Sequence, residues 1–262
     1  MNFYRIRGLA LLCLVFATTP VEGESPGAPV TPQTAIVTRL TKAHDARNLD
    51  AALGAFGPEA SLFDLSTGDV LAQGTKAIRK RYEKQFSNGP DLRTTVRQRI
   101  ALDNYVIDRE SIVTKTGAAP TESITIYFIR DNLIQAAWYL FVEKTDPVRE
   151  KRNGDIIERL FDVTNTRDVG RILDHFTLDV AVRTLPSNGI ELEGRDELSD
   201  RYERSFSNDA ALQVAISEKI LGGDYVVVHE QIESSTGPQF EDLMIYDIKN
   251  GKVKRAWSLL SD

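Results

Sequence analysis

Hydrophobic positions at the start of the chain follow a helical spacing and then a strand spacing. Residues 35–56 repeat apolar side chains every three or four positions, with a break at 47–48, and this pattern predicts two consecutive helices. A short extended stretch at 60–63, a turn at 66–69 and a second short strand at 70–71 follow. The chain therefore begins with a helical pair and a small hairpin.

The next stretch predicts one more helix and then a series of strands. Ile78, Tyr82 and Phe86 recur at a four-residue spacing after Gly74, which places them on one face of a helix over 75–86. Apolar runs and alternation then predict strands at 92–102, 105–113 and 124–129, and a last strand that ends near Trp138. Helices, a hairpin, a helix and a long antiparallel meander together indicate an α+β fold.

The same pattern occurs twice. The octapeptide RYEKQFSN at 81–88 returns as RYERSFSN at 201–208, and the match extends on both sides at a constant offset of 120 residues. After a one-residue deletion, 126–140 aligns with 245–259. The match spans about a hundred residues per copy, which is the size of a domain and not of a short solenoid repeat.

These copies set the expected domain boundaries. We expect a first domain over 35–144 and a second over 155–262. The charged segment 145–154 is expected to be a linker, which either stays irregular or continues into the first helix of the second domain. Residues 24–34 contain three prolines and indicate an extended leader.

The N-terminus has the layout of a secretory signal. Two arginines precede an apolar run at 8–17, which is shorter than the ~20 residues a membrane span needs. We expect 1–23 to be a cleaved signal peptide and the mature, secreted or periplasmic protein to start near Glu24. A retained anchor helix and a lipoprotein processed at Cys13 are the alternatives. Because Cys13 is the only cysteine, the mature protein would have no disulfide.

Composition excludes several classes of function. The formal net charge of −6 and the absence of a basic cluster argue against a nucleic-acid partner. The sequence has no phosphate-binding loop, dinucleotide fingerprint or nucleophile elbow, and His44, His175 and His229 lack the spacing of a metal site. We therefore expect no cofactor and no metal.

The order of elements resembles a known family. Helices that open after Gly74 and Gly194 and closing strands with Ala-Trp at 137–138 and 256–257 are similar to the SnoaL-like polyketide cyclases of the nuclear transport factor 2-like superfamily. The resemblance covers both copies. It implies two tandem cone-shaped domains, each a curved antiparallel sheet wrapped around about three helices, with a pocket at one end. Since such domains commonly pair through their sheets, it also implies a pseudo-dimer within one chain, monomeric in solution.

Two residues are candidates for acid–base chemistry. Asp64 lies where isomerase-like members of the superfamily carry their base, and His175 has a side chain that titrates near neutrality. The second copy has Thr184 in place of Asp64, and the isomerase oxyanion acid would fall at Thr125 and Leu243, which are not acids. A solvated turn aspartate and a structural or exposed histidine are the alternatives.

Aromatic residues shared by the copies are the candidates for ligand binding. Large flat side chains with a polar tip suit a pocket for a hydrophobic ligand, and they suit a core equally well. Arg255 shares strand parity with Trp257, so it either binds an anion in the pocket or pairs with an acid across the repeat interface. The candidates are Tyr82, Tyr127, Trp138, Tyr202, Tyr246, Arg255 and Trp257.

Three functional hypotheses follow. The first is an extracytoplasmic protein that binds a small hydrophobic molecule in a cone-shaped pocket, which requires a cavity of roughly 300 Å³ or more. The second is an isomerase, cyclase or dehydratase that uses Asp64 or His175 on a small hydrophobic or polyketide-like substrate. The third is a scaffold whose cones are filled by side chains.

Overall fold

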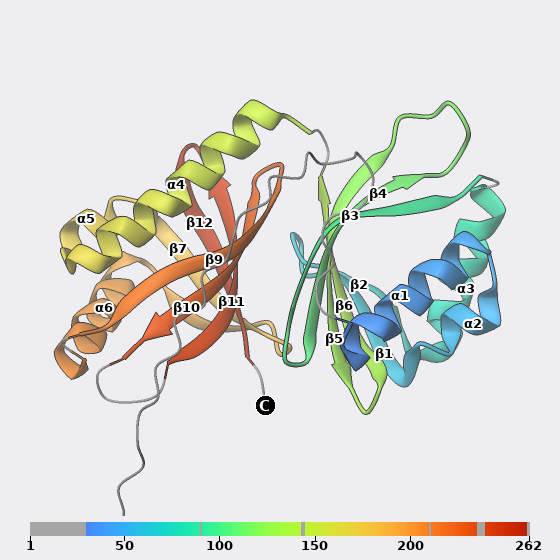
Figure 1. The fold of residues 1–262 in the computed structure, drawn as a ribbon, viewed down its shortest axis with the longest axis horizontal. Helices are drawn as coiled ribbons and strands as arrows, with labels where there is room; N and C mark the ends of the chain where they lie inside the picture. The colour runs from blue at the N-terminus through green and yellow to red at the C-terminus, as the bar shows by residue number, and fades with distance from the viewer. Residues whose placement is uncertain (1–29, 90, 143–144, 210, 235–238, 261–262) are drawn as a thin grey trace, which may run out of the picture.

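The chain contains two consecutive units of the same design. The computed structural model describes residues 30–260 apart from 90, 143–144, 210 and 235–238, so the expected signal peptide lies outside the described residues. In each unit a six-stranded sheet carries helices on the face turned away from the other sheet, and the two sheets face each other at the centre of the molecule (Figure 1).

The elements of the first unit are α1 (Pro32–Asp45), α2 (Leu49–Leu53), β1 (Phe56–Asp64), β2 (Val70–Gln73), α3 (Gly74–Asn88), β3 (Arg93–Leu102), β4 (Tyr105–Val113), β5 (Thr121–Arg130) and β6 (Leu133–Val142). Those of the second are α4 (Pro147–Thr166), α5 (Val169–Leu173), β7 (Phe176–Leu185), β8 (Gly189–Glu193), α6 (Arg195–Asn208), β9 (Gln213–Gly222), β10 (Tyr225–Glu233), β11 (Phe240–Lys249) and β12 (Lys252–Leu259). The predicted α+β order and its duplication are confirmed.

Both sheets have the same topology. The strand orders are β2-β1-β6-β5-β4-β3 and β8-β7-β12-β11-β10-β9. All neighbours are antiparallel except β1 with β6 and β7 with β12, which are parallel. Register shifts interrupt β3 between Val96 and Gln98 and the β5–β6 pairing between Phe128 and Ile129. Such bulges increase the local bend and twist of a strand, as a sheet that curves around helices requires.

Local sequence signals explain where the helices begin. Thr31 and Thr34 form a capping box at the start of α1, and Asn48 caps α2 through its side chain. Asp146 caps α4, and Pro147 occupies the first turn, where its missing N–H costs nothing. The segment expected to be a linker is thus mostly helical from Pro147 onward, since its charged residues lie on a helix that has its own cap.

The helices close each cone over the inner face of its sheet. Ile78, Tyr82 and Phe86 of α3 are all buried and pack against the sheet with Val106 and Tyr127, which confirms the helical face predicted from their spacing. In the second unit Leu198 is buried at the place of Ile78. Each unit therefore has a hydrophobic core between its helices and its sheet.

A third hydrophobic cluster joins the outer faces of the two sheets. Ile124 and Trp138 of the first sheet belong to the same buried cluster as Ile245 and Trp257 of the second. The approach is close at Gly222, where an added Cβ would lie 2.8 Å from the Cδ1 of Ile124. The cluster packs the sheets of the two units against each other.

Two arginines cross this interface. Arg109 of β4 donates to the carbonyl of Leu221 at 2.5 Å and pairs with Glu150 of α4 at 3.1 Å. Arg255 of β12 donates to the carbonyl of Ser66 at 2.6 Å. These contacts fix the register of one sheet on the other. Among the described residues, no helix has the length and apolar character to cross a membrane.

Candidate functional site

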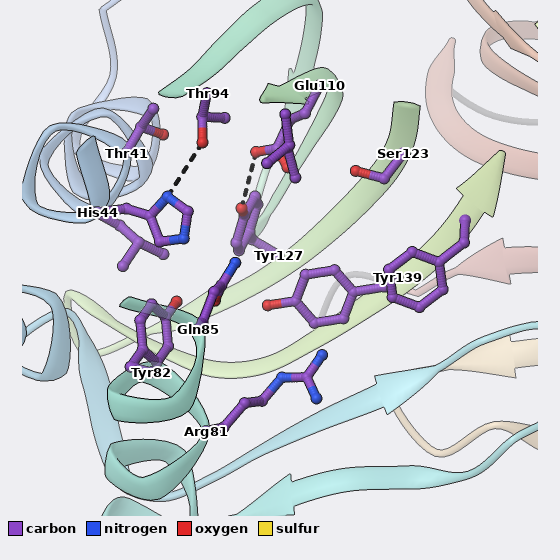
Figure 2. A pocket seen from close by; sticks show the side chains of 13 residues that line it. Thr41, His44, Arg81, Tyr82, Gln85, Thr94, Glu110, Ser123, Tyr127 and Tyr139 are labelled. Atoms are coloured by element: carbon purple, nitrogen blue, oxygen red, sulfur yellow. Dashed lines mark hydrogen bonds between the residues drawn. The ribbon is translucent and has the colours of Figure 1, made fainter. Parts of the chain in front are cut away.

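A cavity of about 90 Å³ lies inside the first cone, between α1, α3 and strands β3 to β6 (Figure 2). Its volume corresponds to about three water molecules at about 30 Å³ each. It is well below the roughly 300 Å³ of a pocket for a drug-sized ligand, so it suits a compact molecule. It is lined by Leu40, Thr41, His44, Arg81, Tyr82, Gln85, Thr94, Glu110, Ile112, Ser123, Tyr127, Tyr139 and Phe141.

Glu110 forms the acidic part of this cavity. It points inward from β4 because it shares strand parity with Val106, which packs in the first core. The side chain is almost fully buried, and it accepts hydrogen bonds from the hydroxyl of Thr125 at 2.9 Å and from that of Tyr127 at 3.1 Å. Both donors come from β5, the neighbouring strand.

Burial changes the protonation of this carboxyl. The loss of water around Glu110 raises its pKa from 4.5 to about 7, and the nearby charge of Asp108 adds to the rise. The hydrogen bonds from Thr125 and Tyr127 act in the opposite direction, since they stabilise the charged form. A carboxyl with a pKa close to neutrality can hold or release a proton under ordinary conditions, which is a property of acid–base groups.

Asp108, on the same strand, is neutralised by its own partner. Arg99 of β3 holds it through two hydrogen bonds of 2.6 Å, from Nε and Nη2, and also bonds the hydroxyl of Thr38 on α1. A bidentate pair of this kind is the geometry that best stabilises a buried carboxylate. Asp108 therefore contributes to the field at Glu110 without itself lining the cavity.

His44 of α1 contributes a ring to the wall of the cavity. Its Nδ1 lies 3.1 Å from the hydroxyl of Thr94, and its ring meets that of Tyr82 edge-on at 5.8 Å between centroids. Burial lowers the pKa of His44 below 6.5, although the side chain of Gln85 and the charge of Asp45 oppose this. The imidazole is therefore mostly neutral at pH 7.

Three polar groups face the cavity with few protein partners. The hydroxyl of Ser123 is buried and has no hydrogen-bond partner within the described part of the chain. The guanidinium carbon of Arg81 lies 5.9 Å from the centre of the Tyr139 ring. The Tyr139 hydroxyl points toward Gln85, into the cavity (Figure 2). A buried hydroxyl without a partner costs free energy, so this wall is suited to a bound polar group.

The second cone repeats the acid and the tyrosine but not the surroundings. Tyr246 donates to Glu230 at 2.8 Å, and burial raises the pKa of Glu230 to about 8. Asp242 stands at the position equivalent to Ser123, and burial raises its pKa to about 6. The second cone therefore holds two carboxyls where the first holds one carboxyl and a hydroxyl.

The two candidate acid–base residues lie outside both cones. Asp64 accepts hydrogen bonds from the amide and the hydroxyl of Ser66, at 2.9 and 2.6 Å, and thereby closes the turn after β1. His175 follows α5, and its Nδ1 lies 3.1 Å from the carbonyl of Arg171 in an exposed position. These contacts agree with the alternatives of a turn aspartate and a structural histidine, and neither residue is among those that line the first cavity.

The aromatic candidates divide between the cones and the interface. Tyr82 and Tyr127 line the first cavity, and Tyr202 and Tyr246 belong to the core of the second cone. Trp138 and Trp257 instead pack between the sheets, because alternation along β6 and β12 turns them away from their inward neighbours. Of the two alternatives for these tryptophans, a pocket wall or a core, the structure has the core.

Arg255 likewise lies at the interface and not in a pocket. It shares the face of Trp257, as its parity indicates, and its guanidinium carbon lies 5.2 Å from that ring's centre. Its acidic partner is Asp247 of the same domain, at 2.6 Å, while Ser66 supplies the contact across the repeat interface. Arg255 thus couples the two domains.

The residues that sequence reasoning missed are Glu110, His44, Arg81 and Tyr139. One signal was available for the first of them. Glu110 and Glu230 align at the repeat offset, and each lies at an inward position of a largely buried strand. An acid retained in both copies inside a buried strand indicates a partner or a function, since an unpaired buried carboxyl is costly.

Comparisons with known proteins identify the relatives. The model of the SnoaL-like domain matches 37–137 and 157–256, that is, both units. No curated protein matches the sequence significantly.

Solved structures that are similar each cover about one of the two units. They include a cystatin fold protein from Novosphingobium aromaticivorans, at 16% identity and TM-score 0.38, which covers 41% of this chain and 97% of that one. An NTF2-like protein from Cytophaga hutchinsonii has 16% identity and TM-score 0.36, with 46% and 95% covered. A protein with a ketosteroid isomerase-like fold from Catenulispora acidiphila has 16% identity and TM-score 0.35, with 40% and 83% covered.

Proposed function

Because this chain belongs to the SnoaL-like domain family over both of its repeats, we propose that it binds a small molecule inside its first cone, at Glu110. One observation carries the proposal. A cavity of about 90 Å³ contains a buried carboxyl and, in the same wall, the unpartnered hydroxyl of Ser123. A pocket with aromatic walls and a few convergent polar groups is the usual form of a small-molecule site.

The size of the cavity restricts the ligand. It admits a molecule of only a few non-hydrogen atoms, because about 90 Å³ is the space of about three waters. A polyketide-like compound would require the helices to move away from the sheet. The rings of Tyr82, Tyr127 and Tyr139 supply the apolar contact, so the ligand combines a short carbon skeleton with at least one polar group.

Acid–base catalysis by Glu110 is the second candidate. A pKa of about 7 lets Glu110 accept a proton from a bound substrate and return it at another atom, as an isomerase or dehydratase requires. Thr125 and Tyr127 hold the carboxyl in one orientation while it does so. In this form of the enzyme hypothesis Glu110 takes the role first considered for Asp64 and His175.

The second domain is the proposed structural partner of the first. Its sheet covers the outer face of β4 to β6, so the strands that carry Glu110 and Tyr127 are supported from behind. We further propose that the chain is secreted or periplasmic, mature from about Glu24, and monomeric. The composition of 1–23 supports export, and mass spectrometry of the intact exported protein would test it by its N-terminus.

A fragment screen tests the binding proposal. Ligand-observed NMR would measure binding of compounds with at most about eight non-hydrogen atoms to the full chain, to Ser123→Leu and to Asp242→Leu. Ser123→Leu fills the first cavity, and Asp242→Leu is the matched change in the second cone. The proposal expects hits that are lost in Ser123→Leu and kept in Asp242→Leu. Hits that survive Ser123→Leu would place binding elsewhere and overturn it.

A further inference from the structure

The first cavity has a positively charged side chain without an acidic partner among the described residues. Arg81 is its cationic side chain, and no described carboxylate forms an ion pair with it. Its neighbour in the cavity is the Tyr139 ring, 5.9 Å from the guanidinium carbon. A guanidinium that is partly removed from water and lacks a carboxylate partner attracts an anion.

The equivalent arginine in the second domain is differently placed. Arg201 forms an ion pair with Glu191 of β8. The second cone also has Asp242 where the first has Ser123. The first cone therefore has a hydroxyl where the second has a carboxyl, and its arginine lacks the ion pair that Arg201 makes, so the first cone favours an anionic ligand more than the second does.

Hydroxyl groups with unused hydrogen-bonding capacity face the first cavity. The hydroxyls of Ser123 and Tyr139 make no hydrogen bond within the described part of the chain, and the hydroxyl of Tyr82 points toward the same space (Figure 2). A ligand with several acceptor atoms close together can accept hydrogen bonds from these hydroxyls and from Arg81. A carboxylate offers two oxygens and about four lone-pair sites in a group small enough for about 90 Å³.

We propose that the ligand of the first cone is a short-chain carboxylate, whose carboxyl group pairs with Arg81 and whose carbon chain lies against the tyrosine rings beside Glu110. The inference rests on the proposed function, because it names the substrate class of the same cavity. It also assigns Arg81 as the residue that selects an anion over a neutral molecule of the same size.

Glu110 adds a dependence on pH. An ionised Glu110 repels a carboxylate, whereas its protonated form donates a hydrogen bond to it, so binding is stronger at pH 6 than at pH 8. The titratable and charged groups packed around Glu110 are Asp108 on β4, Arg99 on β3, Tyr127 on β5, Tyr139 on β6, Arg81 and Tyr82 on α3, and His44 on α1.

Calorimetric titration of the full chain with sodium propionate and with propionamide, its neutral analogue, tests this inference. At pH 6 we expect Arg81→Gln to weaken propionate binding about tenfold or more, as loss of a charged hydrogen-bonding partner does. We expect Arg201→Gln, the matched change in the second domain, to leave it within about twofold. Arg81→Lys keeps the charge and should retain part of the affinity. Propionamide should bind the wild type and Arg81→Gln alike.

The outcomes separate this inference from the proposed function. Propionate that binds Arg81→Gln as well as the wild type overturns the carboxylate assignment. A second result also overturns it: the wild type binds propionamide but not propionate, and Ser123→Leu abolishes the binding of propionamide. In that case the cavity remains a binding site. If neither compound binds and the fragment screen gives no hit in the first cone, both proposals fail.

Discussion

The hydroxyl of Tyr127 donates a hydrogen bond of 3.1 Å to the carboxyl of Glu110 inside the first cone. The equivalent pair in the second cone, Tyr246 and Glu230, is joined at 2.8 Å. A buried carboxyl and phenol are expensive to keep in a core unless each satisfies the other. Both copies have this pair, whereas the neighbouring position is Ser123 in the first copy and Asp242 in the second. The pair is therefore common to both domains, and the residues around it differ.

Stability is expected to fall as the pH rises from 5 to 8. Glu110 and Glu230 have folded pKa values of about 7 and about 8, above their unfolded 4.5, so the folded state holds their protons more tightly. Their stabilisation is complete below pH 4.5 and is lost as the pH rises through the folded values. For Glu230 the loss in the free energy of unfolding is on the order of 4 kcal/mol.

Urea denaturation at pH 5 and pH 8 measures this effect. Burial lowers the pKa of His44, so His44 destabilises the folded protein as the pH falls below 6.5, opposite to the effect of the glutamates. The comparison of wild type with Glu230→Gln therefore isolates the contribution of the Glu230 carboxyl to stability. The variant should lose less stability than the wild type between the two pH values. An equal loss in both proteins would show that Glu230 keeps an ordinary pKa.

Tyr127→Phe is expected to raise the pKa of Glu110 further. The variant removes one of two hydrogen bonds that stabilise the ionised form, and it should cost about 1 kcal/mol of stability. Carbon-13 NMR of the glutamate carboxyls would follow the titration. Tyr105→Phe is the control, since the Tyr105 hydroxyl lies at the interface without a described partner. A Glu110 pKa that is equal in wild type and Tyr127→Phe would contradict the role of this bond.

Trp138→Ala is expected to destabilise the whole chain by about 3–5 kcal/mol, as is typical when a large buried ring is removed. Trp138 is 1% exposed and packs between the two sheets, so the loss should reach both domains and separate their unfolding transitions. Phe141→Ala on the same strand, at a side chain 43% exposed, should cost less than about 1 kcal/mol. Differential scanning calorimetry measures both, and an unchanged single transition in Trp138→Ala would count against a shared core.

The chain is expected to be monomeric, because its two sheets already cover each other. Light scattering should give the mass of one chain across micromolar concentrations. A symmetric dimer would mean that another face also associates, and the pseudo-dimer would then be an incomplete account of the assembly.

Much of the fold could be predicted from the sequence. The repeat fixed the number of domains, and the spacing of Ile78, Tyr82 and Phe86 identified the face by which α3 docks. The sequence left open whether 145–154 stays irregular or continues into a helix, and Asp146 and Pro147 carry the helix-start signal that favours the helix.

The site was harder to predict, for a physical reason. The central strands are buried on both faces, one by the helices and the other by the partner sheet, so apolar side chains do not distinguish inside from outside. For Trp138 the sequence therefore left a pocket wall and a core as alternatives, and the structure has it in the core between the sheets. Glu110, an acid repeated at the equivalent position as Glu230, was the residue that marked the inner face.

The most direct test is a crystal structure of the full chain grown with the tightest-binding fragment. The account predicts that the fragment lies in the first cone, in contact with Glu110 and between Arg81 and Tyr139. Density for the fragment in the groove between α4 and β9, which Phe161 and Ile216 line, with the first cone unchanged, would contradict it.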